Sequence, residues 1–130
     1  MSDVLVDTSA WVAFLRGEKN AVARLDPLIS DDRVSIAGAV YAEVLSGAPT
    51  LAAYQQLRVT LDALEWLAGP ADLWERVAHA RFTLARQGIQ ATLADLLLAV
   101  TASHAGHALL TRDRDFLRIR QVVPLDVLLV

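Results

Sequence analysis

The chain has no cysteine and a single lysine, Lys19, among its 130 residues. Without cysteine it can form neither a disulfide framework nor a thiolate that acts as metal ligand or nucleophile. With one lysine, chemistry that depends on a buried catalytic lysine has almost nowhere to take place. The basic side chains are otherwise all arginine, eleven in number.

Long uninterrupted apolar runs are also missing. The richest stretch, residues 93–110, is interrupted by Asp95, His104, Gly106 and His107, so a membrane span is not expected. The first four residues, Met1 to Val4, carry no basic side chain of the kind that begins a secretory signal. We therefore expect a cytoplasmic protein without membrane association.

What is present is a large apolar fraction, 55% of the residues, with a net charge of −3. This composition excludes intrinsic disorder and predicts one domain with a core of its own. A negative net charge argues weakly against nucleic-acid binding, because phosphates attract a basic surface. If several carboxylates share a metal pocket, however, the rest of the chain is close to neutral and the objection loses its force.

Short β-branched runs alternate with longer segments of helical periodicity. Strands are predicted at residues 4–6, 34–36, 64–67, 108–111 and 122–123. Helices are predicted at residues 10–16, 20–29, 38–45, 50–61, 69–87 and 92–105, with a short helical turn at 116–119. Thr8 and Ser9 are the expected caps of the first helix. The pattern predicts an α/β fold with a mainly parallel β-sheet flanked by α-helices, with ligands at the carboxyl ends of the strands.

Four acidic residues occupy positions that purely structural carboxylates rarely take. Asp7 ends the first predicted strand, and Asp113 follows the strand at 108–111. Glu43 lies in the helix after the second strand, and Asp95 lies near the start of an almost wholly apolar helix. An ionised carboxylate on an apolar helix costs several kcal/mol unless it is paired or coordinates a metal. In a parallel sheet all four positions can converge on one edge.

Each of these acids also has a plainer interpretation. Asp7 could cap a helix, Glu43 could face solvent, Asp95 could pair with an arginine, and Asp113 could belong to a solvated charge run. Taken together, these separate explanations are less economical than a shared metal site. Carboxylate oxygens select a hard ion such as Mg²⁺ or Mn²⁺, and the matching chemistry is hydrolysis of a phosphodiester.

Four segments carry a family resemblance: Asp7-Thr8-Ser9-Ala10-Trp11, residues 43–47, residues 94–99 and residues 110–116. They resemble the motifs of PIN-domain ribonucleases and, more narrowly, of the VapC toxins of VapBC toxin–antitoxin systems. The resemblance covers residues 1–130 and implies a single PIN-like nuclease domain. It implies an endoribonuclease that uses Mg²⁺, with Mn²⁺ as a substitute, and whose metal-binding catalytic acids are Asp7, Glu43, Asp95 and Asp113.

The resemblance has further implications for neighbouring residues and for partners. Supporting polar roles would go to Thr8, Ser9, Thr111 and Asp115. Arg112 and Arg114 either hold RNA phosphates or are simply solvated. The expected partners are an RNA substrate, a cognate VapB-type antitoxin and a second copy of the chain.

Two other functions compete with this hypothesis. A phosphohydrolase of the haloacid-dehalogenase type would need a second aspartate where the chain has Ser9, and a catalytic lysine. A non-catalytic PIN-like interaction module would be expected to have lost part of the acidic set, which is intact. The histidines, His79, His104 and His107, do not form a convincing metal set, and a surface or capping role is favoured. The larger aromatic residues are predicted to lie in the core or at an interface: Trp11, Phe14, Trp66, Trp74 and Phe82.

Overall fold

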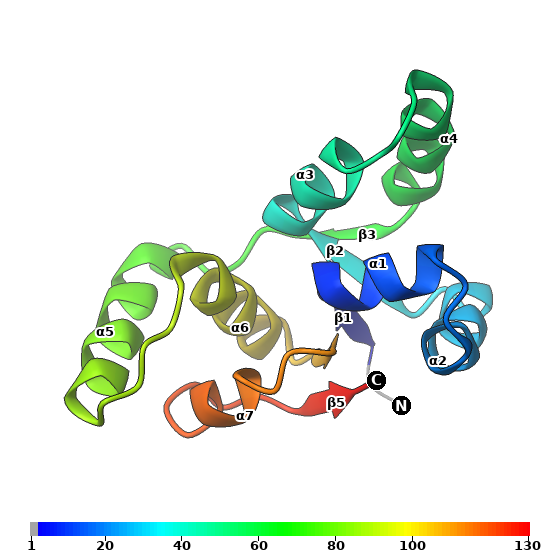
Figure 1. Cartoon of the computed structure of the whole chain (residues 1–130). Helices are drawn as coiled ribbons and strands as arrows, with labels where there is room; N and C mark the ends of the chain where they lie inside the picture. The colour runs from blue at the N-terminus through cyan, green and yellow to red at the C-terminus, as the bar shows by residue number, and fades with distance from the viewer. Residues whose placement is uncertain (1–2) are drawn as a thin grey trace.

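The computed structural model describes residues 3–130; Met1 and Ser2, part of the N-terminal segment discussed above, lie outside the described residues. Within that range a five-stranded parallel sheet has the order β3-β2-β1-β4-β5 (Figure 1). The strands are β1 (Val4–Val6), β2 (Val34–Ala37), β3 (Glu65–Leu67), β4 (Ala108–Thr111) and β5 (Val127–Leu129). The predicted α/β class is confirmed.

Helices connect and cover the strands. They are α1 (Thr8–Leu15), α2 (Lys19–Ser30), α3 (Gly38–Ser46), α4 (Leu51–Asp62), α5 (Leu73–Arg86), α6 (Leu93–Ala105) and α7 (Phe116–Ile119). Helix α5 packs on α6 and α1 packs on α2, and the two pairs lie at opposite sides of the view in Figure 1. None of the helices in residues 3–130 combines the length and hydropathy needed to cross a membrane.

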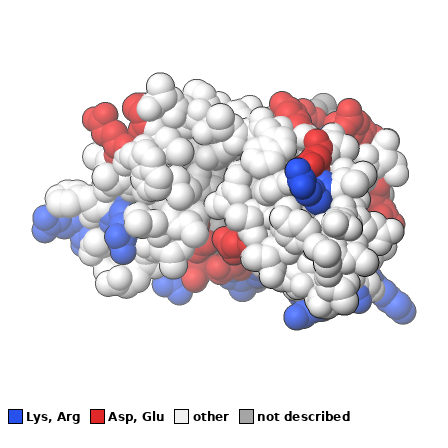
Figure 2. Space-filling view, turned by 90° about the horizontal axis from the view of Figure 1, so that it is seen from above, with Lys and Arg blue, Asp and Glu red and all other residues white. Residues whose placement is uncertain are grey.

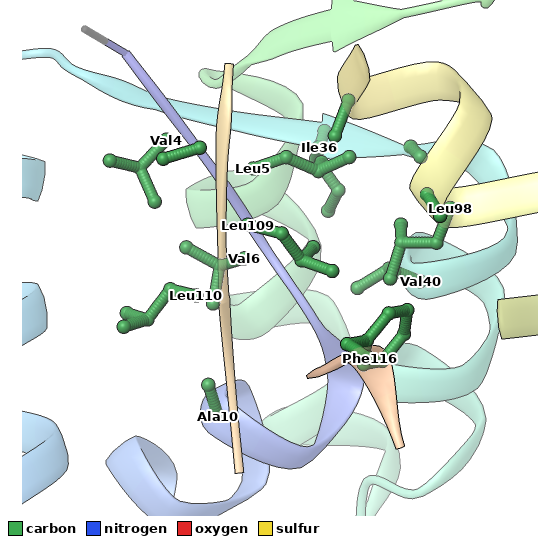
Figure 3. Close-up of a cluster of buried hydrophobic side chains, with 14 of the residues drawn as sticks. Val4, Leu5, Val6, Ala10, Ile36, Val40, Leu98, Leu109, Leu110 and Phe116 are labelled. Carbon is green, nitrogen blue, oxygen red and sulfur yellow. The ribbon is translucent and has the colours of Figure 1, made fainter. Parts of the chain in front are cut away.

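The core lies around the central strand β1, whose three residues are all buried. Side chains from β4, α3, α6 and α7 close around it (Figure 3), and Leu5, Leu109 and Phe116 have no exposed surface. Burying each such side chain contributes about 1.5–3 kcal/mol to the free energy of unfolding. This packing fixes the strands whose carboxyl ends carry Asp7 and Asp113.

The last strand is not where the sequence pattern placed it. Residues 122–123 were predicted to form it, but the strand observed is β5, which pairs in parallel with β4. Val122 and Val123 continue the turn after α7, where their amides donate to the carbonyl of Ile119. Pro124 then has no N–H to offer a sheet ladder, so the pairing strand forms further along the chain.

Two helix starts also differ from the predictions. Helix α5 begins at Leu73 rather than at 69–70, because Gly69 has φ +81° and a turn closes from Leu73 N–H to the carbonyl of Pro70. The cap of α1 is Asp7, while Thr8 and Ser9, the expected caps, are helical. Helix α2 continues through Pro27 to Ser30.

The aromatic residues divide into two groups. Trp11 is fully buried and its ring meets Phe14 edge-on at 5.9 Å. Trp66, Trp74 and Phe82 are 49%, 63% and 58% exposed. They are therefore not core residues, and of the two predicted locations only an interface is compatible with their exposure.

Candidate active site

Asp7 and Asp113 meet because they follow neighbouring parallel strands. Strands β1 and β4 pair in register, and the ladder extends to the amide of Asp7, which donates to the carbonyl of Leu110 at 2.9 Å. Asp113 comes two residues after Thr111, the last residue of β4. Both carboxylates are half-buried at what we call the carboxyl edge of the sheet, the edge where the parallel strands end.

The carboxylate of Asp7 accepts three hydrogen bonds. Its Oδ1 accepts from the amide of Thr8 at 2.7 Å, which caps α1. Its Oδ2 accepts from the hydroxyls of Ser9 at 2.9 Å and Thr111 at 2.8 Å. Asp7 is therefore both a helix cap and a member of the acidic group, so the plainer interpretation and the functional one are compatible.

The hydroxyls of Ser9 and Thr111 also connect Asp7 to the loop after β4. Each accepts a backbone N–H from that loop, Ser9 from Arg112 at 3.1 Å and Thr111 from Asp113 at 3.0 Å. Each hydroxyl has a single proton, which it donates to Oδ2 of Asp7 while its oxygen accepts the backbone N–H. The amide of Asp115 then donates to Oδ1 of Asp113 at 2.9 Å. The predicted residues Asp7, Ser9, Thr111, Asp113 and Asp115 thus belong to one hydrogen-bonded network.

Asp95 joins this group from the first turn of α6. The helix is capped by Thr92, whose Oγ1 accepts from the amide of Asp95 at 3.1 Å. Burial, and after it the charges of Asp113 and Asp7, raise the pKa of Asp95 to about 6. These electrostatic effects require the carboxylates to lie close together. In Figure 2 a compact group of acidic side chains lies in a hollow near the middle of this face.

Glu43 occupies a different position. It is exposed on α3 and lines a groove of about 690 Å³ together with apolar residues of α1 and α4, among them Leu15 and Leu57. Among the described residues, the charges that raise the pKa of Asp95 do not include Glu43. The structure thus brings three of the four predicted acids together, adds Asp115, and leaves Glu43 at the wall of an adjacent groove.

The two candidate phosphate-binding arginines are not equivalent. Arg112 donates from Nη1 to Oε2 of Glu18 at 2.7 Å, whereas Arg114 is exposed on the same loop. Nothing in the sequence signalled the Glu18 contact, because the two residues lie 94 positions apart. The Oγ1 of Thr8 is buried, and no hydrogen-bond partner for it is found within residues 3–130.

The carboxyl edge suits a divalent cation. Its donors are all carboxylate and hydroxyl oxygens, the ligand type of hard ions. Burial raises the pKa of Asp95, and repulsion from the carboxylates of Asp113, Asp7 and Asp115 adds to that effect. A bound dication would relieve that repulsion.

Comparison with known proteins agrees with this geometry. The family described as "PIN domain" matches residues 4–122. Ribonuclease VapC17 of Mycobacterium tuberculosis is 30% identical over 121 residues, covering 89% of this chain and 91% of that protein.

Solved structures show the same fold. A crystal structure of VapBC2 from Rickettsia felis bound to a promoter DNA fragment gives a TM-score of 0.78 at 20% identity, covering 98% of each chain. VapBC-1 from nontypeable Haemophilus influenzae gives 0.77 at 20% identity, covering 97% of this chain and 96% of that one. PIN nucleases use divalent metal ions, which agrees with the all-oxygen donor set.

Proposed function

The chain belongs to the PIN-domain family, and from this premise we propose that it is a Mg²⁺-dependent endoribonuclease, the toxin of a type II toxin–antitoxin pair. The observation that carries the proposal is the meeting of Asp7, Asp95 and Asp113 at the carboxyl edge, where burial and mutual repulsion raise the pKa of Asp95. The similarity to ribonuclease VapC17 supports RNA as the substrate. We propose that residues 1–130 act as one nuclease domain in the cytoplasm, where RNA is available.

In this proposal Asp7, Asp95 and Asp113 hold the ion, with Mn²⁺ as a substitute for Mg²⁺. Such an ion, when bound, supplies activation of water and stabilisation of the charge that develops on the phosphodiester. Ser9 and Thr111 keep the carboxylate of Asp7 in one orientation through their bonds to Oδ2. Asp115 positions Asp113 through its backbone amide and adds a fourth negative charge at the rim.

Glu43 is proposed as the fourth catalytic acid. Its place on α3 lets it face a substrate that lies across the carboxyl edge and the adjacent groove. Because Glu43 is exposed and outside the tight cluster, it should contribute less to ion binding than Asp95 does. Its replacement by glutamine should therefore weaken cleavage less than Asp95→Asn.

We assign the contacts with RNA phosphates to the two loop arginines. Arg114 is exposed directly beside Asp113, and within residues 3–130 it has no ion pair to break before it reaches a phosphate. Arg112 must first leave Glu18, and this exchange costs part of the gain. Thr8 would steady the first turn of α1 below the substrate.

The antitoxin is proposed to occupy the groove beside Glu43. The groove is lined mainly by apolar side chains of α1, α3 and α4, which suits an amphipathic segment of a VapB-type protein. A guanidinium from that segment could bind Glu43 or the clustered carboxylates bidentately and take the place of the ion's charge. The exposed Trp74 and Phe82 on α5 are the surface that we assign to a second copy of the chain.

Brief induction followed by sequencing of RNA 5′ ends tests the proposed activity. We expect new ends at a small set of sites with wild type and none with Asp95→Asn. Co-expression of the product of an adjoining small gene should restore growth and yield a stable complex. Unchanged RNA ends on induction of the wild type would contradict the nuclease assignment, and toxicity that no neighbouring product relieves would contradict the toxin assignment.

A further inference from the structure

A second group of ionisable side chains lies at the opposite edge of the sheet, the amino edge, where the parallel strands begin. One carboxylate oxygen of Asp3, one of Glu65 and a ring nitrogen of His107 all lie within 4.8 Å of one another. Among residues 3–130 this is the one set of three acidic or histidine side chains with that spacing. It includes none of the acids at the carboxyl edge.

The backbone of the sheet fixes these three residues. Asp3 precedes β1 and His107 precedes β4, and the carbonyl of Asp3 accepts from the amide of Ala108 at 3.1 Å. Glu65 opens β3 and is the register partner of Ser35 in β2. Glu65 thus lies in a strand, and Asp3 and His107 each directly precede one, so the hydrogen-bonded sheet sets the spacing of the three backbones.

Ser35 contacts both Val4 and His107, and the direction of its hydrogen bonds is tied to the tautomer of His107. Ser35 is fully buried, and its hydroxyl donates to the carbonyl of Val4 at 3.2 Å. The same oxygen lies 2.9 Å from Nδ1 of His107. Where Ser35 gives its one hydroxyl proton to Val4, Nδ1 is the donor in this contact. The neutral imidazole then carries its lone pair on Nε2.

This arrangement is the one that metal-binding histidines use. Such a histidine donates its second ring nitrogen to a buried acceptor, which orients the ring and increases its basicity. Ser35 lies outside the donor set and supplies this contact. Two carboxylates lie near this ring, of which Asp3 is in an ion pair with Arg33, and a dication would balance the negative charge that remains.

The spacing is compatible with an ion after small side-chain rotations. A point equidistant from three atoms 4.8 Å apart is about 2.8 Å from each, against about 2.0–2.2 Å for zinc bound to nitrogen or oxygen. Glu65 is exposed and can turn inward at little cost. Arg33 forms an ion pair with Asp3, with Nε 4.0 Å from Oδ1, so an ion would share this carboxylate with the guanidinium.

We propose that Asp3, Glu65 and His107 bind a transition-metal dication of the Zn²⁺ class and fasten together the starts of β1, β3 and β4. One imidazole with two carboxylates favours Zn²⁺ over Mg²⁺, because imidazole is a poor ligand for hard ions. Three protein ligands leave further positions for water. This site does not depend on the nuclease function.

Calorimetric titration of the tag-free full chain with Zn²⁺, in excess Mg²⁺ to occupy the carboxyl edge, tests the proposal. We expect one Zn²⁺ per chain, with the affinity reduced at least about 100-fold by His107→Ala or Glu65→Gln and about 10-fold by Ser35→Ala. His104→Ala is the matched control, because His104 is an exposed histidine three residues away. It should keep the wild-type affinity.

Two results would overturn the proposal. Either the wild type binds no Zn²⁺, or His107→Ala and His104→Ala bind Zn²⁺ equally, as scattered surface histidines would. If a variant of the buried Ser35 fails to fold, the exposed Glu65→Gln variant still tests the proposal. The inactive Asp7→Asn variant should still bind Zn²⁺ and melt at a higher temperature with it, which separates this site from the nuclease.

Discussion

The two edges of the sheet carry different polar chemistry. At the carboxyl edge, Asp7, Asp95 and Asp113 are half-buried and their partners are hydroxyls and backbone amides. At the amino edge, two carboxylates face an imidazole, and Arg33 lies near Asp3. The same parallel strands thus end in an all-oxygen group and begin in a mixed nitrogen and oxygen group.

This difference has an electrostatic consequence. At the carboxyl edge the pKa of Asp95 rises to about 6, because burial and neighbouring carboxylates disfavour its charge. The carboxylates at that edge repel one another, and a bound hard dication would reduce this repulsion. The amino edge contains a nitrogen donor and a nearby guanidinium, so the negative charge of its two carboxylates is partly balanced.

Removing a charge at the carboxyl edge should have the largest effect on activity. Asp7→Asn and Asp113→Asn should each reduce RNA cleavage by a factor on the order of 10³ or more, because an ion ligand is lost while the shape is kept. Cleavage of a labelled RNA by purified protein measures this, with circular dichroism as the check on folding. Asp26→Asn, an exposed acid on α2, should cleave like wild type. If Asp26→Asn is as inactive as the other two, the effect is not specific to the site.

The second largest effect is expected in the pH dependence of Mg²⁺ binding at the carboxyl edge. Below about pH 6 Asp95 takes up a proton in the folded protein, and the proton competes with the ion. The affinity for Mg²⁺ should therefore fall up to about tenfold per pH unit below 6 and level off above it. Calorimetric Mg²⁺ titrations of wild type and Asp95→Asn between pH 5 and 8 give the comparison. A wild-type affinity that is constant over this range would contradict the assignment of Asp95 as a ligand.

Loss of a hydroxyl that orients Asp7 should have a smaller effect. Ser9→Ala removes one of two hydroxyl donors to Oδ2 and should weaken ion affinity and cleavage about 10–100-fold. Thr111→Ser keeps the donor and is the matched control. Excess Mg²⁺ should restore part of the Ser9→Ala activity, as expected for a residue that acts through Asp7. If neither the Mg²⁺ affinity nor the cleavage rate changes, Ser9 does not orient Asp7 and only accepts the hydrogen bond from the loop amide of Arg112.

The smallest effect concerns stability. Without an ion the clustered carboxylates repel, so Asp113→Asn should raise the melting temperature in chelator by a few degrees, about 1 kcal/mol. An asparagine oxygen can still accept from the amide of Asp115, so the loop geometry is kept. Millimolar Mg²⁺ should then raise the melting temperature of wild type more than that of the variant. A variant that melts lower in EDTA would show that Asp113 is structural.

The sequence predicted the fold best where its signals were local. Apolar runs such as 4–6 and 108–111 become the strands because they are buried on both faces. The strand at 127–129 was missed because its partner, β4, is chosen by tertiary packing, while the apolar pair at 122–123 looked equally suitable. The start of α5 was predicted too early because the sequence pattern placed the beginning of the helical periodicity at Gly69. In the structure Gly69 has a left-handed conformation, which is not helical.

The acidic group was foreseen because carboxylates at strand ends and on an apolar helix are costly. Asp7, Asp95 and Asp113 follow from that argument, whereas the position of Glu43 depends on the orientation of α3, which no local pattern fixes. His107 was interpreted as a surface or capping residue. Its neighbours Asp3 and Glu65 lie 104 and 42 residues earlier, so no motif could join them.

The most direct test of the account is a Mg²⁺ titration of RNA cleavage at pH 8, with wild type and Asp95→Asn compared side by side. Wild type should be inactive in EDTA and regain cleavage in proportion to bound Mg²⁺, while Asp95→Asn should remain inactive at every concentration. Cleavage by Asp95→Asn at the wild-type rate, or wild-type cleavage that persists in EDTA, would contradict the claim that the clustered carboxylates form the ion site of a nuclease.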